Sequence, residues 1–120
     1  MKTCELTSPL LDYWVARANG SSAINLKIGP SPRNPEKIVC IENDPSGFAW
    51  IVFAPSTDWS QGGPLMEKYR IDTEKMSKAW LAFFRNKSEA PVVAEGSTPL
   101  QAICRAVVRA KFGEEVDDVG

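Results

Sequence analysis

The segment from Thr98 to Gly113 constrains the fold of this 120-residue chain more than any other. Thr98 is a preferred helix-capping residue, Pro99 suits the first helical position, and Gly113 is typical of the position just after a helix end. Between them, apolar residues recur at helical spacing. They are Leu100, Ile103, Cys104, Val107, Val108 and Phe112. Because a helix with one apolar face must bury it against another layer, the sequence predicts a helix over 99–112 that packs on a core.

The beginning of the chain carries a second pattern of the same kind. Ser8 and Pro9 provide a cap and a first helical residue, and Gly20 provides an end. Apolar residues follow Pro9 at helical spacing. They are Leu10, Leu11, Trp14, Val15 and Ala18. A second amphipathic helix is therefore predicted near the amino-terminal end.

Runs of β-branched and aromatic residues lie between the two predicted helices. The runs 37–42 and 48–53 flank a turn-forming segment of five residues, which predicts an antiparallel hairpin. A short strand is predicted over 24–28, and another over 65–71, where apolar and polar residues alternate. Residues 87–97 are predicted as a polar loop.

Residues 72–86 fit two structures. Their apolar residues fall at helical spacing, whereas the run from Trp80 to Phe84 is also a compact aromatic segment of the kind found in strands. The family resemblance given below favours the strand, and so do we. Together the elements predict an α+β fold, in which two amphipathic helices pack on a small, mostly antiparallel sheet of three to five strands. Residues 1–113 are expected to form a single domain, and residues 114–120 an acidic, frayed tail.

No histidine occurs in the chain, and this absence restricts its chemistry. It excludes acid–base catalysis by histidine, Ser-His and Cys-His nucleophile pairs, and histidine metal ligands. The three cysteines, Cys4, Cys40 and Cys104, are widely spaced and include no CxxC pair, so neither a disulfide framework nor a cysteine zinc site is predicted. We expect no cofactor, no metal ion and no catalytic residue, which weighs against an enzyme without deciding the question.

The charge of the chain bears on its partners and location. The formal net charge is -1, so the basic excess that drives nucleic-acid binding is missing. Arg105, Arg109 and Lys111 on the last predicted helix are expected to face water as a solvated surface. No apolar run reaches the roughly 18 residues of a membrane span, and the first residues lack an apolar signal core. We therefore expect a cytoplasmic protein that binds neither nucleic acid nor a membrane.

The ten residues from Pro55 to Pro64 are predicted to form an irregular loop that could carry a binding site. The loop combines hydrogen-bonding side chains, an indole and flexible glycines. The candidate binding residues are Ser56, Thr57, Asp58, Trp59, Gln61, Gly62 and Gly63. The same composition suits a structural loop, in which Asp58 caps its own turn and Trp59 fills the core.

Three segments together resemble the phage NinX-like family, whose own role is not established. They are Lys2-Thr3 with Glu5-Leu6-Thr7 and Leu11 to Ala16, then Pro55 to Pro64 with Glu67, and then Thr98-Pro99-Leu100, Ala102, Arg105 to Val108 and Lys111 to Val116. The resemblance implies a phage or prophage origin, and it implies no catalytic residues. It also makes the loop from Pro55 to Pro64 the candidate functional surface.

Three functions compete at this point. The first is an accessory protein that binds a host or phage protein through the loop from Pro55 to Pro64. The alternative is a small-molecule binder or small enzyme built on Asp58 and Gln61. The third is a nucleic-acid binder that uses the last helix, and we rank it lowest because its basic strip is small. The sequence predicts no oligomeric state.

Overall fold

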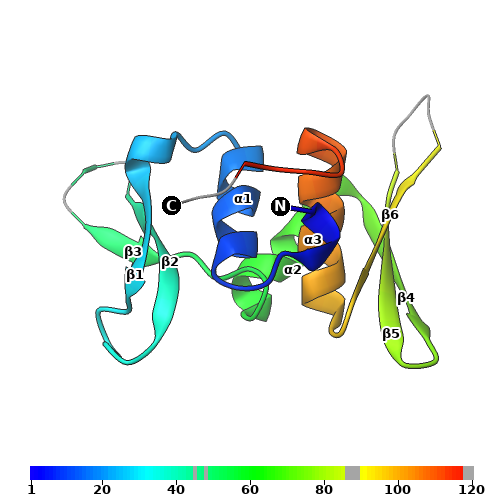
Figure 1. The fold of residues 1–120 in the computed structure, drawn as a ribbon, viewed down its shortest axis with the longest axis horizontal. Coiled ribbons are helices and arrows are strands. Elements are labelled where there is room, and N and C mark those ends of the chain that lie inside the picture. The colour runs from blue at the N-terminus through cyan, green and yellow to red at the C-terminus, as the bar shows by residue number, and fades with distance from the viewer. Residues whose placement is uncertain (45, 48, 86–89, 118–120) are drawn as a thin grey trace.

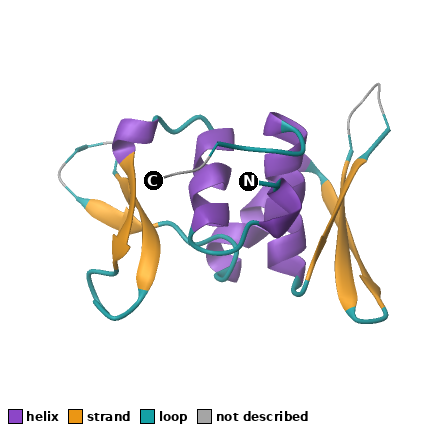
Figure 2. Ribbon diagram, viewed as in Figure 1, coloured by secondary structure: helices purple, strands orange, loops and turns teal. Residues whose placement is uncertain are grey.

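The computed structural model covers the 120 residues and describes 1–44, 46–47, 49–85 and 90–117. These residues form three layers, with a layer of helices between two three-stranded antiparallel sheets (Figures 1 and 2). The predicted α+β class is confirmed. The strands are divided between two sheets instead of forming one, and the helical layer contains a third long helix that the sequence patterns did not predict.

The helix predicted from Thr98 onward is present as α3, Pro99–Phe112. The Thr98 hydroxyl accepts a hydrogen bond of 3.1 Å from the Gln101 backbone N–H, as a cap should. Seven of its side chains are buried, and α3 contacts β5, β6 and both other long helices. The buried residues are Leu100, Ala102, Ile103, Cys104, Ala106, Val107 and Val108. Fully burying one large aliphatic side chain contributes about 1.5–3 kcal/mol, so α3 organises the core.

The first sheet contains β1 (Leu26–Pro30), β2 (Ile38–Asn43) and β3 (Trp50–Val52), in that order. Its β2–β3 pair confirms the predicted hairpin, and Ile41 lies opposite Val52. The short strand predicted over 24–28 is present as β1, shifted by two residues, because the 3-10 helix η2 (Ala23–Asn25) precedes it.

The second sheet contains β4 (Ile71–Met76), β5 (Ala79–Phe84) and β6 (Val92–Gly96). The strand prediction for residues 72–86 is confirmed and the helical alternative is wrong, because the segment turns back at Ser77, whose φ is 43°. The polar loop predicted over 87–97 is wrong where β6 lies, and residues 86–89 fall outside the described part of the chain.

The predictions of a loop over 55–64 and a strand over 65–71 are wrong for residues 59–69, because Trp59–Tyr69 form the helix α2. The irregular loop therefore ends at Asp58, and the strand predicted over 65–71 is absent up to Tyr69. Alternation of apolar and polar residues over a few positions is weak evidence for a strand. In the structure the same segment is helical, and Gly62 and Leu65, three positions apart, lie on its buried face. The helix ends at Arg70, which adopts a left-handed conformation with φ 53°.

The helix α1 spans Leu10–Ala18, and the chain ends meet near it. Ser8 does not cap the α1 backbone, because its hydroxyl donates to the Asp12 carboxylate instead. The tail expected to fray from residue 114 is paired at its start. The Met1 amino group donates to the Val116 carbonyl at 2.9 Å, and Val116 is buried. Residues 118–120 lie outside the described part of the chain.

The long helices run in the same direction. Figure 1 shows α1 and α3 rising together from their amino to their carboxyl ends. The start of α2 lies beside the starts of these helices, and its end lies beside the end of α1. At one end, Thr57 and Trp59 of the α2 start lie with Ser8 and Thr98 around one groove. At the other end, Lys68 of α2 donates to Asn19, which ends α1. The helical layer therefore has an amino end and a carboxyl end.

A first prediction concerns Gly96, where β6 crosses the start of α3. A Cβ atom at Gly96 would lie 2.5 Å from the backbone nitrogen of Ala102, so Gly96→Ala forces the strand and helix apart. Overpacking of this kind costs about 1–3 kcal/mol. We expect the free energy of unfolding, measured by urea denaturation, to fall by that amount.

Gly29→Ala in β1 is the matched control, because a Cβ atom there meets nothing within 4 Å. We expect its unfolding free energy to stay within about 1 kcal/mol of the wild type, since replacing a strand glycine carries little strain where space is open. Equal losses for the two variants would contradict the close approach of β6 to α3.

Candidate functional site

A groove of about 520 Å³ opens at the amino end of the helical layer, and we call it the Trp59 groove. It is bounded by the residues that precede α1, the start of α2 and the start of α3. They are Thr7, Ser8, Ser56, Thr57, Trp59, Ser97, Thr98, Leu100 and Gln101. Three candidate residues from the sequence, Ser56, Thr57 and Trp59, therefore line one hollow, whereas Asp58, Gln61, Gly62 and Gly63 do not line it.

Trp59 is the first residue of α2, and 54% of its surface is exposed. The structural alternative, in which Trp59 fills the core, is therefore wrong. Trp14, on α1, is buried, so the two tryptophans have different roles. An indole held at a fixed helix end presents a large apolar surface that solvent must leave when a partner binds.

Asp58 caps α2 in the way that the structural reading of the loop describes. Its Oδ1 atom accepts hydrogen bonds of 2.9 Å from the Ser60 N–H and 2.7 Å from the Ser60 hydroxyl. These bonds favour the charged form and lower the pKa of the Asp58 carboxyl. Asp58 is thus an ionised cap whose oxygens hold the first turn of the helix.

Gln61 connects α2 to the end of β3. Its Oε1 atom accepts a hydrogen bond of 2.9 Å from the Ala54 N–H, and its Nε2 atom donates to the Val52 carbonyl at 3.3 Å. Gly62 is needed for packing, since a Cβ atom there would lie 2.3 Å from the Pro55 carbonyl oxygen. A Cβ atom at Gly63 would make only an ordinary contact, so packing does not require a glycine there. Three of the seven candidates, Asp58, Gln61 and Gly62, therefore hold the loop on the helix.

Asp12 lies directly behind the groove and is fully buried, a position that the sequence analysis did not identify. Its Oδ1 atom accepts from the Ser56 N–H at 2.8 Å, and its Oδ2 atom accepts from the Ser8 hydroxyl at 2.9 Å. Burial raises the pKa of the Asp12 carboxyl, and the contacts with Ser56 and Ser8 oppose that rise. The Ser56 hydroxyl is buried near this carboxyl and makes no hydrogen bond to any residue that the structure describes.

Asp12 therefore joins α1 to the loop that precedes α2. One sequence signal could have indicated this role, because Ser8 and Asp12 are four residues apart, the spacing of neighbours on one helix face. The contact with Ser56, 44 positions along the chain, exists only in the folded structure.

Arg105 and Arg109 do not form the solvated strip that the sequence suggested. Arg105 donates to the carbonyls of Leu6 and Glu95, at 3.0 and 2.9 Å. Arg109 donates to the Val93 carbonyl at 2.9 Å. Because β6 is an edge strand, the two guanidinium groups occupy carbonyls that would otherwise be open to a further strand. Their role is to fix β6 against α3.

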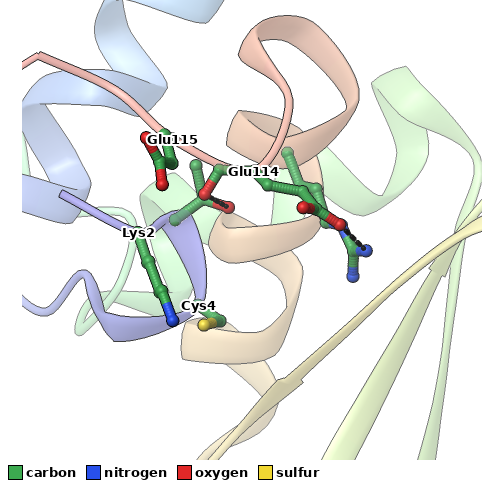
Figure 3. A pocket seen from close by; sticks show the side chains of 6 residues that line it. Lys2, Cys4, Glu114 and Glu115 are labelled. Atoms are coloured by element: carbon green, nitrogen blue, oxygen red, sulfur yellow. Dashed lines mark hydrogen bonds and ion pairs between the residues drawn. The ribbon is translucent and has the colours of Figure 1, made fainter.

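A smaller hollow of about 240 Å³ lies where the chain ends meet. Figure 3 shows Lys2 and Cys4 on one side of it and Glu114 on the other, and Glu114 forms an ion pair with Arg109. The Arg109 Nη2 and Glu114 Oε1 atoms are 3.2 Å apart, and both side chains are exposed to water. The charges in this hollow come in both signs, so it selects no particular charge on a ligand.

The cysteines divide into two kinds. Cys40 and Cys104 are buried, and burial raises the pKa of the Cys40 thiol to about 12 and the pKa of Cys104 as well. Cys4 is exposed. Within the described ranges, no three acidic, cysteine or histidine side chains gather closely enough to hold a metal ion. No helix in those same ranges has the length and apolar character needed to cross a membrane.

One comparison with known proteins identifies the family of the chain. The family model described as Bacteriophage P22, NinX matches residues 2–111, a range that includes the Trp59 groove and all but the last residue of α3. The resemblance drawn from three segments of the sequence is thereby confirmed. No curated protein matches the chain significantly.

A second prediction concerns the pH dependence that Asp12 creates. Its pKa in the folded protein lies above the ordinary value of 3.8, so the native state binds this proton more tightly than the unfolded chain does. The contribution of Asp12 to stability is therefore largest below pH 3.8 and falls as the pH rises through the raised pKa. Asp12→Asn keeps an acceptor for Ser56 and removes the titration.

Urea denaturation of both proteins between about pH 3 and 7 measures this effect. We expect the free energy of unfolding of the wild type, minus that of Asp12→Asn, to decrease as the pH rises. A difference that is constant or increases with pH would contradict the assignment. Asp12→Ala should be less stable than Asp12→Asn throughout, because it leaves the buried Ser56 N–H without an acceptor.

Proposed function

The chain belongs to the phage P22 NinX family, and on that premise we propose that it is an accessory protein of phage origin that binds a host or phage protein through the Trp59 groove. Its site of action in this proposal is the cytoplasm of the bacterial host. The proposal retains the binding function expected from the sequence but moves the contact surface. The partner meets the groove beside Trp59, and the remaining loop residues support it.

The exposure of Trp59 is the observation that carries this proposal. More than half of the Trp59 surface is open to solvent. The helix end that carries it is held in place by the Asp58 cap and by the hydrogen bond of Gln61 to Ala54. Tryptophan is enriched among the few residues that dominate the energy of protein interfaces. A rigid anchor also loses little conformational entropy when it binds.

The surroundings of Trp59 fit the same interpretation. The groove is lined by exposed polar residues, and the buried Leu100 contributes an apolar part. The polar residues include Thr7, Ser8, Thr57 and Thr98. Protein interfaces combine an apolar anchor with a polar rim whose groups exchange hydrogen bonds with water for bonds to the partner. The groove offers both parts over adjacent surface.

The alternative, a small-molecule binder or enzyme built on Asp58 and Gln61, receives less support. Both side chains are engaged within the protein, and the pKa of Asp58 is lowered, whereas a general acid or base near neutral pH needs a raised one. The carboxyl with a raised pKa is Asp12, which is fully buried with both oxygens bonded. For these reasons we favour binding over catalysis.

A third prediction tests the groove with two tryptophan variants. Trp59 and Trp50 are both exposed, at 54% and 38%, but Trp50 lies on β3 in the first sheet, outside the groove. Tagged wild type, Trp59→Ser and Trp50→Ser are used to capture proteins from lysates of infected and uninfected host cells. A captured protein is then purified and its Kd is measured against each version by fluorescence anisotropy.

We expect Trp59→Ser to weaken binding by about 30-fold or more, the effect of losing an interface residue worth about 2 kcal/mol. Trp50→Ser should bind as the wild type does. Equal affinity for all three would remove the groove from the proposal. Weakening by Trp50→Ser alone would place the partner on the first sheet. Circular dichroism spectra and urea midpoints establish that each variant is folded.

A further inference from the structure

The carboxyl end of the helical layer gathers side chains from the last turns of α1, α2 and α3. Asn19, which ends α1, accepts hydrogen bonds from the Tyr69 hydroxyl and from the Lys68 amine, the latter at 3.4 Å. Lys111 of α3 places its amine 5.5 Å from the centre of the Tyr69 ring. Three segments distant in sequence thus share one small area of surface.

Cations and aromatic rings alternate across this area. The Lys68 amine lies 5.0 Å from the Tyr69 ring centre, on the same ring that Lys111 approaches. The Arg17 guanidinium lies 5.7 Å from the Trp14 ring, and Trp14 contacts the Phe112 ring edge-on at 5.3 Å between centres. We call this area the basic surface. It consists of Arg17, Lys68, Tyr69, Lys111 and Phe112, and the buried Trp14 supports it from beneath.

The three cations have no acidic partner in the described part of the chain. Neither ion pair recorded there involves Arg17, Lys68 or Lys111. Their hydrogen bonds go to neutral groups, from Arg17 to the Tyr13 hydroxyl at 3.3 Å and from Lys68 to Asn19. Lys68 and Lys111 are both exposed, so their charges are open to a partner.

The helix dipole explains part of this arrangement but not all of it. Each helix end carries about half a negative charge, which favours a nearby cation. Three full positive charges exceed the roughly 1.5 negative charges of three such ends. None of the recorded hydrogen bonds of Arg17 and Lys68 reaches a terminal backbone carbonyl. The surface therefore keeps an excess of positive charge.

We propose that the basic surface binds a short acidic segment of a partner protein, with two or more carboxylates over Lys68, Lys111 and Arg17 and an apolar side chain against Phe112. Clusters of cationic side chains recognise acidic motifs in this way. Phe112 is 39% exposed, so its ring provides an apolar contact between the charges. This proposal does not depend on the Trp59 groove, which lies at the opposite end of the helices.

The charge of the whole protein favours a short peptide over nucleic acid. The net charge is -1, with 15 acidic residues, so a long polyanion that extends beyond the basic surface meets repulsion. A peptide of a few residues contacts only the three cations. The two lysines also approach the Tyr69 ring, which leaves less of that ring for base stacking.

The fourth prediction uses a synthetic peptide as the probe. A fluorescein-labelled peptide of about ten residues carries four glutamates around a central leucine, and its control has glutamine at each glutamate. Anisotropy is measured at about 0.05 and 0.3 M salt, a range over which screening of exposed charges increases strongly. We expect the acidic peptide to bind, its affinity to fall with salt, and the glutamine peptide to bind at least about tenfold more weakly.

Protein variants locate the binding site. Lys68→Gln with Lys111→Gln should weaken binding roughly tenfold, as expected for two exposed ion pairs. The matched control is Lys75→Gln with Lys78→Gln, since Lys75 also approaches an aromatic ring, that of Trp80, at 5.5 Å. That control and Trp59→Ser should bind as the wild type does. Phe112→Ala should weaken binding to the leucine-containing peptide.

Three outcomes would overturn the proposal. The first is no binding of the acidic peptide at low salt, or equal binding of the glutamine peptide. The second is equal weakening by both lysine pairs, which would show that only general charge matters. The third is tighter binding of an oligothymidylate of about 20 nucleotides that displaces the peptide and is sensitive to the Lys68 and Lys111 changes, which would make the partner a nucleic acid.

Discussion

The burial of α3 is the constraint on which the rest of the structure depends. Its seven buried side chains contact strands β5 and β6 on one side and helices α1 and α2 on others. A helix covered on several sides needs small residues where it meets other backbones, and Ala102 provides one beneath Gly96. Since α1 runs in the same direction as α3, the helical layer has two different ends.

This polarity separates two surfaces of different chemistry. The amino ends bring together hydroxyl groups and an exposed indole, since capping residues collect where helices begin. The carboxyl ends bring together Lys68, Lys111 and Arg17, since cations are favourable where helices end. The groups that stabilise the helix ends therefore give the protein one end rich in hydroxyl groups and one basic end.

The sequence predicted those elements whose signals are local. The helix α3 has a cap, a period and an end in one segment, and the β2–β3 hairpin has two apolar runs around a short turn. The helix α2 was not predicted because Pro64 and two glycines are typical of a loop. Its cap, Asp58, was interpreted as a candidate binding residue of that loop. The rest depends on distant contacts. Only the fold shows that Asp12 meets Ser56, or that the seven loop candidates divide between the groove and the support beneath it.

The pairing of the chain ends has a mechanical consequence. Met1 donates to Val116, Thr3 donates to Glu114, and Lys2 lies opposite Glu115 in an antiparallel bridge. Because the two segments are antiparallel, a force that pulls the termini apart acts first on the Met1–Val116 pair and reaches the other pairs only after it breaks. The ends should therefore peel open at low force, while the hydrogen bonds between β4, β5 and β6 carry no load until α3 itself is drawn out of the core.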